Sequence, residues 1–134
     1  TGTLAPDNYP GSQLPVMFDS TYKMAKTAIF IDKNGRVIKI TLGKGIYPYA
    51  SVTPLGNNRF MACGGMMPDK SPANTCTVYH ENKGTVTNST PITLNTGRYG
   101  HSAIRLKNGK VLLIGGFSPD VADMPLELID PSKS

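Results

Sequence analysis

Two stretches decide the fold of this chain: SVTPLGNNRFMACGG at residues 51–65 and SAIRLKNGKVLLIGG at residues 102–116. They align without a gap at a separation of 51 residues, so that serine meets serine and each double glycine meets the other. Beyond the glycines, and with one residue of slip, residues 76–80 fall on residues 126–130. A repeat of about 50 residues built from short apolar runs is typical of a radial array of β-sheets.

The apolar runs of both copies predict strands. The expected strands of the first copy are 50–55, 59–64, 75–80 and 85–90, and those of the second copy are 102–106, 110–115 and 126–130. The run Val111-Leu-Leu-Ile114 is apolar at every position, as in a strand that is covered on both faces by neighbouring sheets. No part of the chain shows a sustained helical period of apolar residues. The fold class is therefore predicted to be all-β.

A further hairpin is predicted at residues 27–40, where Asn34-Gly35 supplies the positive φ angles of a tight turn. We interpret it as a degenerate third copy of the hairpin that opens each repeat. The chain then divides into an extended N-terminal arm (1–20), a partial unit (21–46), a full unit (47–97) and an incomplete unit (98–134). The incomplete unit lacks a fourth strand, and residues 14–18 are expected to donate one to it.

The two cysteines stand at related places in the first copy. If residues 60–64 pair antiparallel with residues 75–79, residues whose numbers add up to about 139 lie opposite each other, and Cys63 and Cys76 meet that condition. Paired strands bring such side chains close enough for a disulfide. The alternative is two buried free thiols that pack as small apolar residues.

Composition excludes some functions. The formal net charge of +5 comes from single, scattered Lys and Arg residues without interleaved aromatics, which argues against nucleic acid as a partner. No apolar run approaches the roughly 18 to 20 residues of a membrane-spanning helix, so no membrane span is expected.

The stretch RYGHSAIRLKNGKVLLIGG at residues 98–116, followed by Ile129-Asp-Pro131, resembles the kelch repeat, in particular the bacterial variant of galactose-oxidase-like β-propellers. The resemblance implies four-stranded antiparallel blades with residues 102–106 innermost. A propeller usually needs four to eight blades, whereas this chain has room for two to two and a half. We expect the ring to be completed either by oligomerisation, with a homotrimer giving six blades, or by missing parts of a longer chain.

Two matching loops, 66–74 and 117–125, are expected on the same face of the molecule. They carry Asp69, Asp120 and Asp123 beside methionine and phenylalanine. Acidic side chains with an aromatic neighbour suit a sugar or a calcium ion, and Asp120 and Asp123 are the candidate calcium ligands. The alternative is that each Pro-Asp pair only begins a turn.

The loops between units form a second candidate surface. This surface contains Asn95 and the ligand-binding candidates Tyr47, Tyr49, Arg98 and Tyr99. Tyrosine supplies rigid amphipathic contact area, while the kelch resemblance implies that Arg98 can instead pair with backbone. His80 is interpreted as capping a turn, and the kelch resemblance implies that His101 makes a structural hydrogen bond within its blade. The two cysteines lack the spacing and the nearby histidine of a zinc-type site, and no Ser/His/Asp triad can be identified.

These observations favour a non-enzymatic recognition module that is extracellular or on a virion surface and binds a carbohydrate or a cell-surface receptor. The receptor-binding tip of a viral or phage attachment protein is one such setting. The alternatives are a fragment of a galactose-oxidase-like or other propeller enzyme, and a kelch-type protein-interaction adaptor.

Overall fold

The computed structural model describes residues 16–17, 25–31 and 37–133, and these residues form antiparallel strands with no α-helix. The predicted all-β class is confirmed. The strands are β1 (Val16–Met17), β2 (Ala25–Ile31), β3 (Val37–Ile46), β4 (Ser51–Gly56), β5 (Arg59–Cys63), β6 (Thr75–Asn82), β7 (Thr85–Asn88), β8 (Ile92–Thr93), β9 (Ser102–Arg105), β10 (Val111–Ile114) and β11 (Glu127–Ile129), followed by the 3-10 turn η1 (Pro131–Lys133). None of the helical turns in the described residues is long and apolar enough to cross a membrane.

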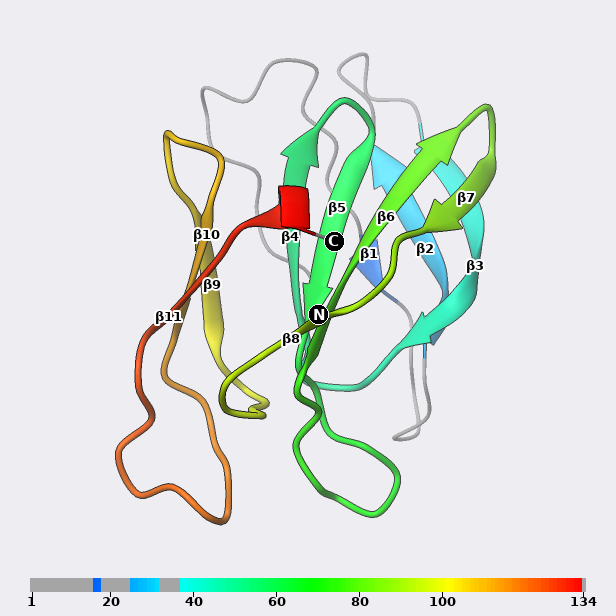
Figure 1. Ribbon diagram of the computed structural model, residues 1–134. Helices are drawn as coiled ribbons and strands as arrows, with labels where there is room; N and C mark the ends of the chain where they lie inside the picture. The colour runs from blue at the N-terminus through cyan, green and yellow to red at the C-terminus, as the bar shows by residue number, and fades with distance from the viewer. Residues whose placement is uncertain (1–15, 18–24, 32–36, 134) are drawn as a thin grey trace.

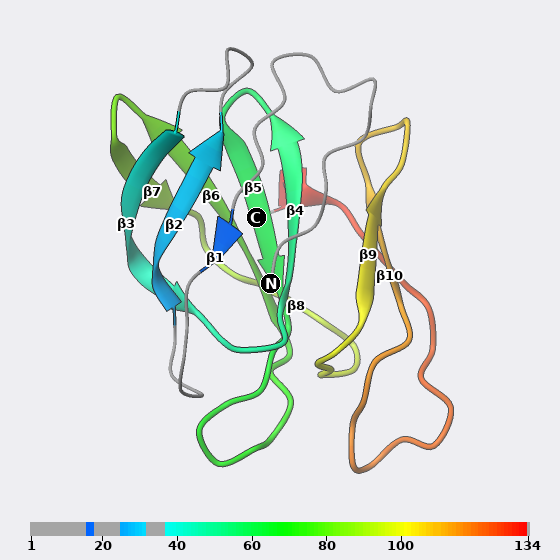
Figure 2. The ribbon, with the colours of Figure 1, turned by 180° about the vertical axis from the view of Figure 1, so that it is seen from behind.

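The strands form three sheets that lie side by side (Figure 1). The first sheet has the order β1-β2-β3, the middle sheet β4-β5-β6-β7 with β8 also paired to β6, and the last sheet β9-β10-β11. The middle sheet lies between the other two. Seen from behind, β3 runs beside β7 and β9 lies next to β4 (Figure 2), in agreement with the contacts between these strands.

The two copies of the repeat fold into the same structure. Ser51 pairs with Cys63 across β4 and β5, and Ser102 pairs with Ile114 across β9 and β10, so both strand pairs keep the 51-residue separation. The third strands show the predicted slip of one residue. Met61 pairs with Val78 in the first copy, and Leu112, 51 residues after Met61, pairs with Leu128, 50 residues after Val78. The sequence repeat is therefore matched by a repeated hydrogen-bonding register between the strands of the two copies.

Two apolar cores fill the spaces between the sheets. One lies between the first and middle sheets and contains Leu42, Ile46, Ala50, Val52, Phe60, Ala62 and Tyr79. The other lies between the middle and last sheets and contains Leu55, Met61, Cys63, Cys76, Val78, Leu94, Ala103, Val111, Leu113 and Ile129. Because successive side chains of a strand point to opposite faces, the middle sheet contributes to both cores.

The hairpin of residues 27–40 forms, but its place in the sheet differs from the prediction. The strand β2 pairs with β1 on one side and β3 on the other, whereas β4 and β9 pair on one side only. The strand β2 therefore lies inside its sheet, whereas the sequence match to β4 and β9 had placed it at the edge.

The donated strand is also corrected. Val16 and Met17 pair with Ile29 and Ala28 of β2, so β1 belongs to the first sheet and adds nothing to the last one. These two residues belong to the predicted N-terminal arm, and the remainder of residues 1–20 lies outside the described residues. The last sheet has three strands within the described part of the chain.

Candidate functional site

Three loops meet at one end of the sheets: residues 47–50 between β3 and β4, residues 64–74 between β5 and β6, and residues 94–101 between β8 and β9. The loop of residues 117–125 reaches the same end of the molecule (Figure 1), as the repeat predicted for it and residues 66–74. Backbone hydrogen bonds tie the three loops together: Gly65 N donates to Arg98 O (2.9 Å), Met66 N to Pro48 O (2.8 Å) and Gly100 N to Tyr49 O (2.9 Å).

The double glycine of the first copy makes this junction sterically feasible. Gly64 has φ 67°, and a Cβ there would lie 2.3 Å from the carbonyl oxygen of Arg98. Gly65 has φ 110°, and a Cβ there would lie 2.6 Å from the Cβ of Tyr47. Both positions therefore require glycine for backbone conformation and for space. Tyr47 is half-buried against this glycine and is not part of the cavity described below.

Arg98 holds the loops onto the last sheet. Its side chain is fully buried, and its guanidinium donates to the carbonyl oxygens of Pro125 (2.8 Å) and Gly115 (3.3 Å). It also forms an ion pair with Glu127 at 3.3 Å. A buried guanidinium with these partners positions the surrounding backbone, so the placement of Arg98 favours the structural interpretation over contact with a ligand.

Aromatic side chains line up across the loops. The ring centroids of Tyr49 and Tyr99 are 6.1 Å apart, and those of Tyr99 and Phe117 are 5.3 Å apart, both in tilted arrangements. Tyr49 is 45% exposed and Phe117 is 52% exposed. Tyr49 also has φ 63°, a left-handed conformation that is uncommon for a residue with a side chain. Exposed rings held on a strained, well-bonded loop are typical of binding surfaces.

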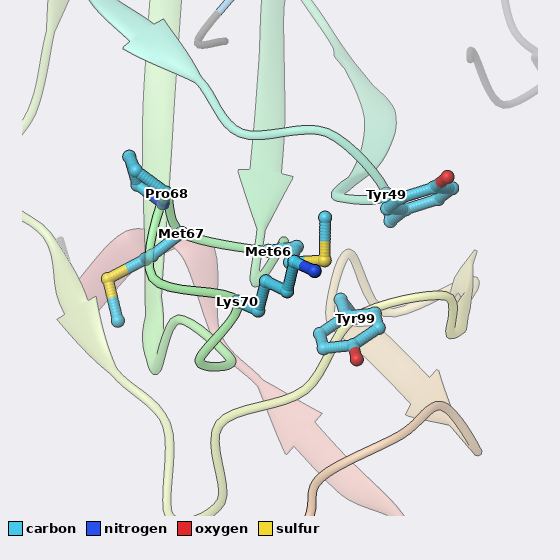
Figure 3. Close-up of a pocket in the computed structure, with 6 residues that line it drawn as sticks. All are labelled: Tyr49, Met66, Met67, Pro68, Lys70 and Tyr99. Carbon is cyan, nitrogen blue, oxygen red and sulfur yellow. The ribbon is translucent and has the colours of Figure 1, made fainter. Parts of the chain in front are cut away.

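A cavity of about 600 Å³ opens beside the two tyrosines. Its lining residues are Tyr49, Met66, Met67, Pro68, Lys70 and Tyr99 (Figure 3). The figure shows Met66 and Lys70 between the tyrosine rings and the Met67-Pro68 side of the cavity. Lys70 is the charged member of this lining, and it too is left-handed, with φ 69°. The wall is thus mostly apolar, with a single cationic group.

The predicted acidic residues are placed differently. Asp69 is exposed, and its Oδ1 accepts hydrogen bonds from the backbone N–H (3.0 Å) and the hydroxyl (2.5 Å) of Ser71. These hydrogen bonds hold the pKa of Asp69 below its ordinary value. The carboxylate therefore closes its own turn, as the alternative interpretation expected, and it does not line the cavity.

Asp120 and Asp123 are both exposed in the loop of residues 117–125. No group of three His, Cys, Asp or Glu side chains suited to hold a metal ion comes together in the described ranges. Calcium at Asp120 and Asp123 stays a prediction.

His101 connects two sheets. Its Nε2 lies 2.8 Å from the hydroxyl oxygen of Ser51 in the middle sheet. Burial, with a smaller contribution from the nearby Arg98 cation, lowers the pKa of His101 to about 4, so the ring is neutral at neutral pH. The hydrogen bond is structural, as predicted, but it joins the loop before β9 to β4 of the middle sheet rather than lying within one sheet. His80 is exposed near the end of β6.

Cys63 and Cys76 are directly paired across β5 and β6 and form a disulfide, with their Cα atoms 4.0 Å apart. Of the two alternatives left open by the sequence, the structure has the disulfide. Cys63 precedes and Cys76 follows the loop that carries Met66 and Lys70, so the disulfide fixes both ends of that loop.

The sequence predicts Tyr49 and Tyr99 as binding residues, and both line the cavity. In the loop of residues 66–74 it predicts Asp69, whereas Met66 and Lys70 are the residues that line the cavity. The signal for this wall was the Met66-Met67 pair, since methionine in a short loop is a common lining of adaptable binding surfaces. No model of a known protein family and no curated protein matches the chain. The assignment of function therefore rests on the geometry of the site.

Proposed function

We propose that this chain is a non-enzymatic recognition module that binds a carbohydrate in the cavity beside Tyr49 and Tyr99. The observation that carries the proposal is the pair of tyrosine rings at the edge of a mostly apolar cavity of about 600 Å³. Small-ligand sites are concave and largely apolar with a few polar groups, and a tyrosine ring offers an apolar face for a sugar ring and a hydroxyl for its polar edge.

The site is preorganised. The loop bearing Tyr49 is hydrogen-bonded to Gly100 and Met66, and the loop bearing Tyr99 is anchored by the buried Arg98. Binding therefore orders few additional groups, which lowers its entropic cost. A rigid sheet that presents loops at one end is a common arrangement for recognition.

The charge of the cavity favours an acidic sugar. Lys70 is the charged lining residue, and the neighbouring carboxylate of Asp69 is directed to Ser71. An ammonium group beside an apolar wall attracts a carboxylate or sulfate group of a ligand. The formal net charge of +5 adds a general attraction for anionic surfaces.

The setting and the finer fold are part of the same proposal. A disulfide persists in oxidising environments, so the bond between Cys63 and Cys76 supports a location outside the cell or on a virion surface. The shared register of the two copies supports kelch-like propeller blades, with the ring completed by sheets beyond those of one chain.

The test is the measurement of binding to acidic and neutral oligosaccharides, first on a glycan array and then by calorimetry. Tyr99→Ala should weaken binding of every recognised glycan by at least about tenfold, because it removes the stacking face. Lys70→Gln should weaken binding of acidic glycans and leave neutral ones nearly unchanged. Lys83→Gln is the matched control, because Lys83 is an exposed lysine with the same left-handed backbone (φ 52°) in the turn between β6 and β7, outside the cavity lining. Unaltered affinity in both cavity variants would contradict the proposal.

A further inference from the structure

Within the described residues, the outer face of the last sheet is apolar and largely exposed. Its apolar side chains, here called the open face, are Ile104, Leu112, Ile114, Leu126 and Leu128. Leu128 and Ile104 are each 50% exposed, and Leu126 is 64% exposed. Leu112 pairs directly with Ile104 on one side and with Leu128 on the other, so these three form a continuous row across β9, β10 and β11.

The repeat shows what such a face does elsewhere in the chain. One repeat earlier, the open-face positions are Thr53, Met61, Cys63, Cys76 and Val78, all of them buried. There Met61 and Val78 pack against Ala103, Val111, Leu113 and Ile129, the inner face of the last sheet. The open face therefore carries, at the same positions and in the same register, the residues that receive a following sheet.

The sequence expectation for β10 points the same way. The run Val111-Leu-Leu-Ile114 has the all-apolar pattern of a strand covered on both faces. Within the described chain only Val111 and Leu113 are covered, whereas Ile114 is 36% exposed. One face of β10 is thus covered by the middle sheet, whereas the apolar side chains of its other face are not covered within the described chain.

We infer that the open face is an interface with a second copy of this chain, in which a sheet of that copy packs on it as the last sheet packs on the middle one. The argument is continuity with an interface already present: the face is built to receive a sheet of this repeat, and this chain is itself the carrier of such sheets. Contiguous apolar faces of this kind on a soluble protein mark interaction surfaces. This inference is independent of the ligand-binding proposal.

The test is the mass of the disulfide-bonded protein in solution, by light scattering and sedimentation velocity from about 1 to 100 μM. Wild-type protein should reach a multiple of 14.4 kDa. Leu128→Glu places a charge in the centre of the face and should give a 14.4 kDa species, whereas Thr87→Glu, a neutral-to-acidic change at an exposed position of β7, should assemble as the wild type does. Leu128→Ala is a milder variant that should weaken the association at least about tenfold, and it serves if the charged variant does not fold.

Hydrogen exchange locates the contact. Amides of residues 126–130 should become more protected as wild-type concentration rises, and not in Leu128→Glu. A wild-type protein that stays at 14.4 kDa throughout the range would overturn the inference, and so would assembly that is unaffected by Leu128→Glu and Leu128→Ala.

Discussion

Arg98 and Glu127 form a buried ion pair, with the guanidinium nitrogen 3.3 Å from the carboxylate oxygen. Glu127 also accepts a 2.6 Å hydrogen bond from the backbone N–H of Asn95. One carboxylate on β11 therefore receives both the side chain and the backbone of the loop that carries Tyr99. The pair couples the stability of the last sheet to the shape of the binding end.

Replacing Arg98 with alanine should strongly destabilise the protein. The change leaves the carboxylate of Glu127 buried without its cation and leaves the carbonyl oxygens of Gly115 and Pro125 without a donor. The free energy of unfolding, measured by denaturant titration, should fall by about 3–5 kcal/mol. The double variant Arg98→Met/Glu127→Leu should recover part of this loss, because it leaves no unpaired charge. A loss below about 1 kcal/mol in Arg98→Ala would show that the pair does not hold the loop.

His101 should make stability depend on pH on the acidic side. Its pKa is lowered from 6.5 to about 4, so the unfolded chain binds a proton at this residue between these values and the folded chain does not. Stability from this group is complete above about pH 6.5 and decreases as the pH falls towards 4. A shift of this size corresponds to about 3 kcal/mol for a fully buried group, and we expect about 1–2 kcal/mol because the ring is only partly buried.

The control for this pH effect is His101→Gln, which keeps a polar side chain beside Ser51 but does not titrate. Thermal unfolding between pH 7.5 and 4 should show a smaller decrease in stability for His101→Gln than for the wild type. Curves of equal slope would rule out the assigned role of His101.

The strand pairs of both copies could be predicted from the sequence, because glycine turns and short apolar runs are signals that neighbouring residues carry. The double glycines, the apolar runs and the 51-residue separation gave the strand pairs of both copies, and the same register placed Cys63 opposite Cys76. The position of β2 within its sheet was not predictable in this way. A hairpin with a glycine turn has the same sequence pattern at the edge of a sheet and inside it, and only the pairing of β1 with β2 shows that β2 is not the edge strand.

Only part of the candidate site could be predicted, because some of its residues depend on contacts that the local sequence does not show. Tyr49 and Tyr99 stand out by residue type, whereas the contribution of Lys70 depends on a left-handed backbone set by the hydrogen bond from its N–H to Met67 O. A carboxylate such as Asp69 looks functional in sequence, but its partner two residues later decides its role.

Alanine substitutions at Gly115 and Gly64 distinguish the cost of a left-handed backbone from the cost of a steric clash. Gly115 has φ 70° and open space around its missing Cβ, so Gly115→Ala should cost only the left-handed strain, about 1 kcal/mol. Gly64 has φ 67° but its Cβ would meet the carbonyl oxygen of Arg98, so Gly64→Ala should cost at least about 3 kcal/mol. Denaturant unfolding of both variants measures the difference. Equal losses would mean that the junction of the loops relaxes freely around residue 64.

Reduction of the disulfide should destabilise the protein without changing the fold class. Cys63 and Cys76 are 13 residues apart, and closing a loop of that size restricts the unfolded chain by about 3 kcal/mol. Thermal unfolding with and without a thiol reductant should therefore show a loss of about 2–4 kcal/mol once a thiol assay detects two free cysteines. The double variant Cys63→Ala/Cys76→Ala should match the reduced protein and be insensitive to reductant.

Because the bond closes the loop of Met66 and Lys70, the reduced protein should also bind acidic glycans more weakly than the oxidised protein at a temperature where both are folded. Equal stability of the fully reduced and oxidised forms would show that the β5–β6 pairing alone holds these ends of the strands together.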